Sequence, residues 1–389
     1  MTPNRRQPHA APPRRDLVFV SAGLELDGGG RALAGRLLAG GSAAYARERG
    51  IGWSLLALGG LDGFGPGGSA ARAFNGSQGA LAMAVWRRQL GAGRRVALVY
   101  DLLGPARPQA WLPPPLRAPY LVAFYGIEVW RRLSGSRFRA LRQAAVRLAT
   151  SSHTLAGARA ANPGFGPAEV VPLCLEERPP AGDVDRALLD RAGRDFLLTV
   201  GRMAATERYK GHDQLLQALQ RLPAVVPRPP APASTIPPPR LVIAGDGDDR
   251  PRLEALAASV GLAGGVLFTG FVSEATLAQL YARAAVFAMP SRGEGFGLVY
   301  LEAMRAARPC VAARASAAAE IVVDGETGLL VDPLDPDAIA LALGRLLASP
   351  ELARAMGEAG RRRLERHFTP RLFRERLWPL LDRLTGEAG

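Results

Sequence analysis

Short apolar runs alternate with helix-like stretches along most of this 389-residue chain, and that alternation limits the fold more than any other feature. Strands separated by helices imply a parallel sheet, because parallel strands can be joined only by a crossover segment. In the first half we expect strands at residues 16–20, 53–58, 95–100, 120–125 and 170–173. Between them we expect helices, among others at residues 31–49, 78–90 and 138–148.

The alternation pauses once and then starts again. Residues 176–194 are polar and contain Pro179 and Pro180, after which an apolar run begins at Phe196. The second half then repeats the plan, with strands expected at residues 196–200, 240–244, 266–269, 286–289 and 310–313. We therefore predict two doubly wound, Rossmann-like α/β domains with a ligand cleft between them.

The predicted boundaries follow from this pattern and from composition. A Pro- and Arg-rich start suggests a disordered leader, a Pro-rich insert at residues 223–239 suggests an exposed loop, and residues 371–384 show an apolar stripe at helical spacing. We expect that last helix to pack across the two domains. The expected units are a leader at 1–15, a first domain at 16–175, a linker at 176–194, a second domain at 195–368 and a crossing helix at 369–389.

Charge and cysteine content narrow the class of protein. The formal net charge of +14 implies attraction to something anionic, whether nucleotide phosphates, a lipid surface or nucleic acid. The two cysteines, Cys174 and Cys310, lie far apart in apolar runs, which favours buried thiols over a disulfide or a metal site. Since neither a long apolar run nor a hydrophobic signal segment occurs, we expect a cytoplasmic protein, with the inner face of the membrane as an alternative location.

Two segments of the second half carry residues suited to a charged, hydroxyl-rich ligand. In residues 290–304, Glu294 falls in a glycine-rich turn after a strand and Glu302 on the following helix. Carboxylates in such positions can accept hydrogen bonds from vicinal hydroxyls, while glycines let backbone N–H groups approach a ligand. A bare pair of glutamates at this spacing means little alone, because a solvated helix face produces it as well.

The second segment, residues 201–213, contains Arg202 and Lys210, and Lys210 is the only lysine in a chain with 49 basic residues. A compact ammonium is not interchangeable with a guanidinium at a tight phosphate site, which favours a functional role over an ordinary solvated loop.

Residues 290–304 resemble the donor-binding loop of the retaining GT-B glycosyltransferases known as family 4, or glycosyl transferases group 1. The resemblance implies that Arg202 and Lys210 neutralise the donor diphosphate. It further implies that Glu302 holds the ribose and that the donor sugar is held by Glu294 and by Gly295, Phe296, Gly297 and Leu298. Segments 245–247, 270–272 and 324–331 resemble further landmarks of the same family.

The first half matches the family more loosely. Gly28, Gly29 and Gly30 resemble a glycine loop that faces the diphosphate, with Gly29 and Gly30 as the donor-binding candidates, although a plain turn explains these glycines almost as well. Tyr125 stands where the family usually has a histidine beside the reacting carbon. Its phenol can donate a hydrogen bond in the histidine's place, or it can be a half-buried core residue without a ligand contact.

The resemblance implies a GT-B glycosyltransferase that needs no cofactor and no metal and uses a nucleotide diphosphate sugar as co-substrate. The acceptor, a carbohydrate, lipid or small molecule, is not identified. The arginines at 131, 132, 137, 139, 142 and 147 could contact a membrane, but a solvated helix face explains them too. A catalytically silent binder of nucleotide sugars is one alternative, and a basic nucleic-acid-binding protein is a weaker one. We expect no nucleic-acid partner, since no base-reading motif is present.

Overall fold

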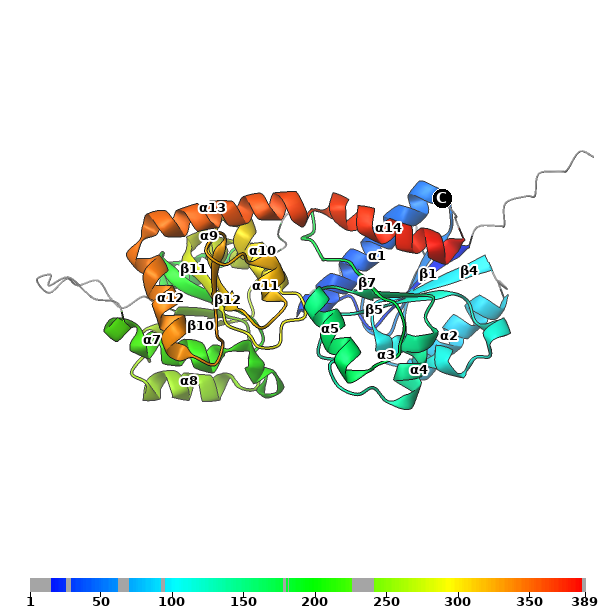
Figure 1. Ribbon diagram of the computed structural model, residues 1–389, viewed down its shortest axis with the longest axis horizontal. Helices are drawn as coiled ribbons and strands as arrows, with labels where there is room; N and C mark the ends of the chain where they lie inside the picture. The colour runs from blue at the N-terminus through cyan, green and yellow to red at the C-terminus, as the bar shows by residue number, and fades with distance from the viewer. Residues whose placement is uncertain are drawn as a thin grey trace, which may run out of the picture.

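The computed structural model describes residues 15–25, 29–61, 70–91, 95–177, 180, 182–225 and 241–386, which form two α/β domains side by side in an elongated molecule (Figure 1). The predicted leader, except Arg15, residues 226–239 of the predicted Pro-rich loop, and Gly28 lie outside the described residues.

The first domain is built on a seven-stranded parallel sheet with the order β3-β2-β1-β4-β5-β6-β7. Its strands are β1 Asp16–Ser21, β2 Trp53–Ala57, β3 Ala70–Ala73, β4 Val96–Tyr100, β5 Tyr120–Phe124, β6 Val146–Ala149 and β7 Glu169–Val170. Its helices are α1 Gly29–Arg49, α2 Gln78–Gly91, α3 Leu103–Ala106, η3 Arg107–Trp111, η4 Pro114–Leu116, α4 Gly135–Gln143 and α5 Ser152–Ala161.

The second domain is built on a six-stranded parallel sheet with the order β10-β9-β8-β11-β12-β13. Its strands are β8 Phe196–Val200, β9 Leu241–Ala244, β10 Val266–Gly270, β11 Ala284–Met289, β12 Cys310–Ala313 and β13 Gly328–Val331. The helices of this half are α6 Arg186–Ala192, η5 Ala205–Lys210, α7 His212–Val225, α8 Arg250–Ser259, α9 Glu274–Arg283, α10 Leu298–Arg305, α11 Ala318–Ile321, α12 Pro336–Ala348 and α13 Pro350–His367, followed by α14 Pro370–Thr385.

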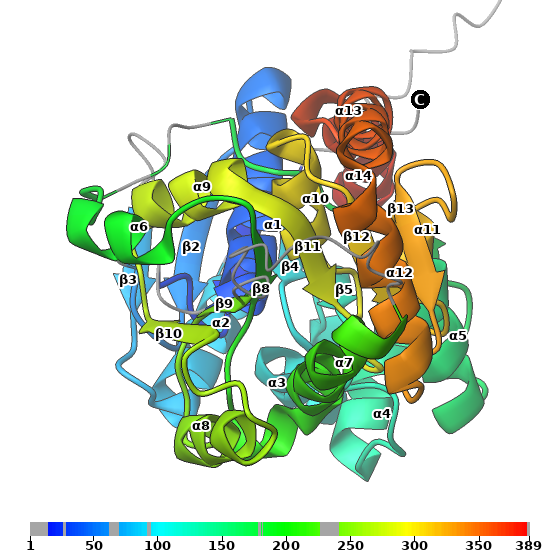
Figure 2. The same cartoon turned by 90° about the vertical axis from the view of Figure 1, so that its left-hand side faces the viewer.

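The central strands of each sheet, such as β4, β5, β9 and β12, are buried on both faces and are therefore apolar. In β1, Leu17 and Phe19 face one core while Val18 and Val20 face the other, as the alternation of side chains along a strand requires. Helices α1 and α14 cover the first of these faces, and α2, α3 and α4 cover the second. In the second domain α9 and α10 lie on one side of the sheet and α7 and α8 on the other (Figure 2).

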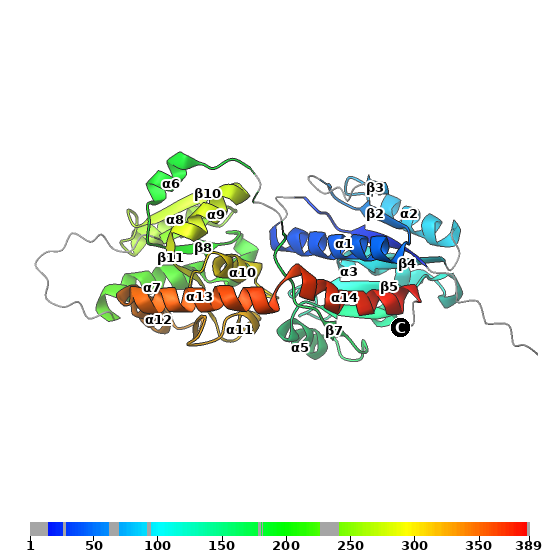
Figure 3. The ribbon, with the colours of Figure 1, turned by 90° about the horizontal axis from the view of Figure 1, so that it is seen from above.

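The C-terminal segment passes from the second domain back to the first, as Figure 3 shows for α13 and α14. The two helices are separated at Phe368, and Thr369 caps α14 by accepting a hydrogen bond from the backbone N–H of Leu372. Helix α14 then packs on α1, where Leu377 is fully buried and the Trp378 indole donates to the carbonyl of Gly41 at 3.2 Å. The expected crossing helix is therefore present.

The α/β fold class is confirmed, but several elements differ from expectation. The predicted helix 138–148 is wrong in its second half: α4 ends at Gln143, and residues 146–149 form strand β6, next to the edge strand β7. A short apolar run fits a strand as well as a helix, and here the buried place between β5 and β7 decides. The expected strand 170–173 is reduced to Glu169–Val170, β3 was missed, and the expected linker contains helix α6.

Candidate functional site

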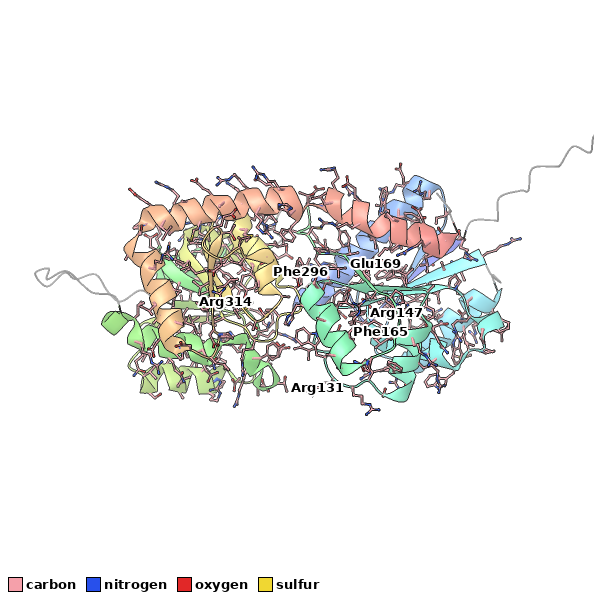
Figure 4. The ribbon with its side chains drawn as sticks, in the orientation of Figure 1. Arg131, Arg147, Phe165, Glu169, Phe296 and Arg314 are labelled. Atoms are coloured by element: carbon pink, nitrogen blue, oxygen red, sulfur yellow. The ribbon has the colours of Figure 1, made fainter. Side chains whose placement is uncertain are left out.

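A cleft of about 900 Å³ lies between the two domains and is lined by residues of both. Phe296 marks its position between the domains in Figure 4. The cleft lining includes every residue proposed from the sequence: Gly29, Gly30, Tyr125, Arg202, Lys210, Glu294, Gly295, Phe296, Gly297, Leu298 and Glu302. The structure thus brings these residues together, although their individual roles stay predictions.

The turn between β11 and α10 places Glu294 at the cleft. Gly297 immediately precedes α10 and has a φ of 99°, a left-handed conformation that favours glycine. Glu294 lies three residues earlier, and its Oε1 accepts a hydrogen bond from Lys210 Nζ at 3.0 Å. The two side chains are 13% and 17% exposed, so they form a largely buried ion pair between the loop and the end of η5. Removing one partner would leave an uncompensated charge in the cleft.

The Lys210 ammonium is held in its charged form. Burial works to lower the pKa of Lys210, but Glu294, Tyr209 and Glu207 outweigh burial and raise that pKa above its usual value. The aromatic ring of Tyr209 lies 5.7 Å from Lys210 Nζ. An ammonium held in its charged form at this place can bind an anionic group.

Arg202 is the second cation of the cleft, and it is paired with a residue that sequence reasoning missed. Its guanidinium donates to Glu207, which is 15% exposed, while Arg202 itself is 47% exposed. Glu207 lies within residues 201–213, the segment identified from the sequence. The alternation of cations and carboxylates in that segment could have indicated an ion pair. With Arg202 and Lys210 each facing a glutamate, the cleft joins two cations with carboxylates that can bind hydroxyl groups.

The segment at residues 245–249 fixes the loop that carries these cations. A Cβ at Gly245 would overlap the carbonyl of Gly201, and a Cβ at Gly247 would overlap that of Met203, so the glycines permit a close approach of two backbones. Asp249 is almost fully buried and accepts hydrogen bonds from Arg208 at 2.9 Å and Arg252 at 2.6 Å. These contacts position Arg202 and Lys210 through the backbone.

Glu302 is half-buried on α10 rather than solvated. The Tyr281 hydroxyl donates to Glu302 Oε2 at 2.9 Å, and burial raises the pKa of Glu302 above its usual range. Tyr281 lies on α9, the helix that follows the landmark at residues 270–272, and the sequence analysis gave it no role. Its hydroxyl fixes the orientation of the carboxylate that the resemblance assigns to the ribose.

The two domains also touch directly at the glycine-rich turn. The carbonyl oxygen of Gly295 accepts hydrogen bonds from Ser151 Oγ at 2.6 Å and Thr154 Oγ1 at 2.9 Å. A Cβ at Gly295 would overlap the carbonyl oxygen of Tyr125. The absence of a side chain at this position therefore lets the second domain lie against β5 and α5 of the first.

A second contact across the domains lies at the N-terminus of α5. Glu320, within α11, accepts hydrogen bonds from the backbone N–H groups of Ser152 at 3.0 Å and His153 at 2.7 Å. The first N–H groups of a helix have no partner within the helix and carry a partial positive charge, so a carboxylate is a favourable partner. The sequence analysis gave no role to Glu320, which follows three alanines.

Tyr125 lies half-buried at the end of β5, against both domains. Its backbone N–H donates to Glu128, and its carbonyl oxygen accepts from Thr154 Oγ1 at 3.2 Å. Among the described residues its phenol oxygen is buried without a hydrogen-bond partner, and burial raises the pKa of Tyr125 well above its usual value. The phenol is therefore neutral and able to donate to a ligand in the cleft.

Gly29 and Gly30 begin helix α1, two residues before the start expected from the sequence. Both are exposed at the cleft, where the N-terminus of a long helix favours an anionic group. Arg36, on the same helix, was missed: it is 5% exposed and pairs with Glu176 at 3.2 Å and with Glu274 of the second domain at 4.0 Å. The sequence signal for Arg36 was its place in a helix composed mostly of alanine, glycine and leucine.

The basic surface expected at residues 131–147 is confirmed only in part. Arg147 is 9% exposed within β6 and donates to backbone carbonyls, including Leu141 at 2.7 Å (Figure 4). It belongs to the interior because β6 replaces the predicted helix. Arg131, Arg132, Arg137, Arg139 and Arg142 are exposed. Within the described ranges no three His, Cys, Asp or Glu side chains are grouped to hold a metal, and no helix has the length and hydropathy of a membrane span.

The match to a known protein family covers the second domain, and the match to solved structures covers both domains. The profile of the family described as glycosyl transferases group 1 matches residues 184–363. The second domain belongs to the glycosyl transferases group 1. The two-domain arrangement is the GT-B fold: a sucrose-phosphate synthase from Thermosynechococcus elongatus superposes with a TM-score of 0.74 over 96% of this chain and 100% of that one, at 22% identity. Anabaena HepE in complex with UDP and glucose gives 0.74 over 95% and 100%, at 18% identity.

Curated relatives match part of the length of this chain. A GDP-mannose-dependent alpha-(1-6)-phosphatidylinositol monomannoside mannosyltransferase from Mycolicibacterium smegmatis is 38% identical over 216 residues, which are 51% of this chain and 52% of that protein. A D-inositol 3-phosphate glycosyltransferase from Xylanimonas cellulosilytica is 39% identical over 189 residues, 48% of this chain and 39% of that protein. The chain spans about half the length of the first of these relatives and a smaller share of the second. The activities of these relatives are therefore stated of those proteins alone.

Proposed function

We propose that this chain is a glycosyltransferase that moves a sugar from a nucleotide diphosphate sugar to an acceptor, with retention of anomeric configuration and without a metal ion. The observation that carries the proposal is the cleft itself. Two cations, Arg202 and Lys210, and two carboxylates, Glu294 and Glu302, line one cavity of about 900 Å³ beside a group 1 domain. This set matches a ligand with an anionic centre and a polyol at each end.

The cations would bind the diphosphate and stabilise the charge that develops as it leaves. Lys210 is kept charged by Glu294, and the N-terminus of α1 at Gly29 and Gly30 offers further N–H donors from the first domain. Charge neutralisation by side chains supplies what a metal ion supplies in other transferases. This argument supports metal independence.

The carboxylates would hold the two ends of the donor. Glu294 and the backbone at 295–298 orient the sugar, and Glu302, itself oriented by Tyr281, accepts hydrogen bonds from the ribose. In the retaining transfer that we propose, the acceptor hydroxyl arrives on the face from which the diphosphate departs. The leaving phosphate then takes the proton of that hydroxyl.

Tyr125, at the position where the family usually has a histidine, is the residue that raises the alternative of a catalytically silent binder. Its buried hydroxyl has no partner among the described residues, and an unsatisfied buried hydroxyl is costly, so a donor hydroxyl would be a favourable partner. Tyr125→Phe should lower the transfer rate by roughly tenfold if this hydrogen bond is made. If donor binding and transfer are unaffected by Tyr125→Phe, the residue belongs to the core alone.

The test begins with the donor. Thermal unfolding should be measured with GDP-mannose, UDP-glucose and an ADP-sugar, since a ligand stabilises the folded state in proportion to the logarithm of its concentration over its dissociation constant. With the preferred donor, Glu294→Gln and Lys210→Ala should each lower transfer or donor hydrolysis on the order of a hundredfold or more. Lys210→Arg is the matched control, because it keeps the positive charge but replaces the compact ammonium with a guanidinium.

Four results would contradict the proposal. Parent-level turnover in both Glu294→Gln and Lys210→Ala would show that these cleft residues take no part in the reaction. A product with inverted anomeric configuration in an NMR assay would exclude retention, and loss of activity in a chelator, restored by a divalent metal, would exclude metal independence. Donor binding without turnover across a broad acceptor panel and without hydrolysis would favour the silent binder.

A further inference from the structure

The positive charge of the chain is concentrated in one stretch of the first domain. Residues 70–150 contain thirteen arginines and only two acidic residues, Asp101 and Glu128. Residues 195–368 contain nineteen basic and nineteen acidic residues. Most of the formal net charge of +14 therefore comes from residues 70–150, while the second domain is balanced.

The fold gathers this stretch on one side of the first sheet. Helices α2, α3, η3 and α4 pack on the same sheet face, and Figures 1 and 2 both show α2, α3 and α4 along the lower side of the molecule. Arg107 Nε donates to Ser136 Oγ at 3.4 Å, which joins η3 to α4, and the N–H of Ala118 donates to Gln89 of α2 at 3.3 Å. We call this surface the basic face; its exposed arginines include Arg87, Arg88, Arg131, Arg132, Arg137, Arg139 and Arg142.

The acidic residues of the stretch do not neutralise this surface. Asp101 is 2% exposed, and Glu128 is half-buried in the cleft lining. The described part of the stretch therefore exposes arginine charge to solvent without interspersed carboxylates. A surface of one sign attracts an extended surface of the opposite sign.

Apolar side chains are exposed within the same face. Trp111 and Leu116, on the segment of η3 and η4, are 57% and 50% exposed, and Leu90 and Met83 on α2 are 52% and 47% exposed. Exposed tryptophan and leucine on a surface that also exposes arginines suit a bilayer interface, where the rings and alkyl groups enter the headgroup region and the cations meet anionic lipids. Nucleic acid has no equivalent use for exposed leucines, and among these apolar side chains only Trp111 could stack on a base.

The basic face adjoins the mouth of the cleft. Ile127 and Glu128 line the cleft, and Arg131 and Arg132 follow on the same segment. Arg131 lies on the lower side of the first domain in Figure 4. A surface bound to the basic face would therefore lie next to the first-domain side of the cleft.

We propose that the basic face binds an anionic lipid membrane and holds the first-domain side of the cleft at its surface, so that the acceptor is a lipid or is attached to one. The choice of acceptor rests on the proposed function, whereas the membrane contact does not. Membrane binding can therefore be tested without donor, acceptor or turnover.

The test is flotation of the full chain with vesicles, using phosphatidylcholine alone and phosphatidylcholine mixed with phosphatidylglycerol, over a salt series. We expect binding to the mixed vesicles only, weakening as salt rises. The triple variant Arg137→Gln, Arg139→Gln, Arg142→Gln should bind the mixed vesicles about a hundredfold more weakly. Trp111→Ser should weaken binding several-fold at every salt concentration.

The matched control removes the same number of exposed arginines from the second domain: Arg354→Gln, Arg362→Gln, Arg366→Gln on α13. It should bind as the parent does, and thermal unfolding with nucleotide sugar should be unchanged in both triple variants. Equal loss of binding in the two triple variants would overturn the proposal, as would binding to phosphatidylcholine alone that is independent of salt. Binding to single-stranded RNA or duplex DNA tighter than to mixed vesicles at the same salt would also overturn it.

Discussion

Replacing Glu320 by alanine removes a carboxylate that holds the two domains together at one edge of the cleft. In the structure this carboxylate accepts hydrogen bonds from the N–H groups of Ser152 at 3.0 Å and His153 at 2.7 Å, in the first turn of α5. The substitution leaves the main chain of Glu320 in place, where its carbonyl accepts from Arg363 at 2.9 Å. The local fold of the second domain should therefore be preserved.

The magnitude follows from the two hydrogen bonds and their position. A half-buried carboxylate at a helix N-terminus is worth up to about 2 kcal/mol, which is also the lower range for hydrogen bonds to a charged group. Losing about 2 kcal/mol shifts the balance between closed and open domains roughly thirtyfold toward open. Because the donor contacts come from both sides of the cleft, the apparent affinity for donor should fall by up to the same factor.

Two measurements check this prediction. Small-angle X-ray scattering of the ligand-free chain should show a larger radius of gyration for Glu320→Ala than for the parent, and the dissociation constant for the preferred nucleotide sugar should rise. Glu320→Gln keeps one acceptor oxygen and should give a smaller change. Glu358→Ala, on the exposed side of α13, is the control for loss of a carboxylate elsewhere on the second domain. If Glu320→Ala matched Glu358→Ala in both measurements, the contact would have no role in closure.

Three further predictions follow from burial and close contacts. Gly295→Ala would place a Cβ against the carbonyl of Tyr125, so we expect weaker donor binding with little change in the melting temperature; normal binding would show that the loop can move aside. Burial raises the pKa of Asp101 to about 7, so between about pH 4 and 7 the folded chain holds a proton that the unfolded chain has lost. The unfolding free energy should therefore fall as pH rises through this range, by roughly 4 kcal/mol at most. Asp101→Asn should lack this fall in denaturant titrations, and an unchanged pH profile would contradict the assignment. Leu377→Ala empties a fully buried position beside Gly41 and should cost about 2–5 kcal/mol of unfolding free energy, whereas a cost below about 1 kcal/mol would mean that α14 contributes little to the first-domain core.

The sequence predicts the fold where periodicity and burial agree. Strands β8 and β12 have the expected ends, because each is an apolar run buried on both faces and bounded by polar or proline-containing segments. The same rule failed at residues 146–149, where an apolar run continues from the end of a helix and only pairing with β5 and β7 makes it a strand. Arg147 was then assigned to the wrong environment, because its partners are carbonyls that the strand brings near.

The candidate site was accessible from the sequence because its main residues lie in two short loops. The contacts between segments could not be predicted from the sequence, because only folding brings the partners together. Lys210 and Glu294 are 84 residues apart in the chain, and Glu320 is more than 160 residues from its partners in α5. Nothing in the local pattern around Glu320 indicates a partner in the other domain. The buried, unpaired hydroxyl of Tyr125 likewise becomes visible only when its surroundings are packed.

The packing of α14 against α1 has a consequence for biosynthesis. Phe373, Leu377 and Leu381 of α14 share one buried cluster with Leu37 and Leu38 of α1, so part of the interior of the first domain is supplied by residues 370–385. On the ribosome, the sheet of β1–β7 emerges long before that helix does. A nascent chain must therefore keep an apolar surface of α1 uncovered until the second domain has been translated, which makes this surface a natural place for a chaperone to bind.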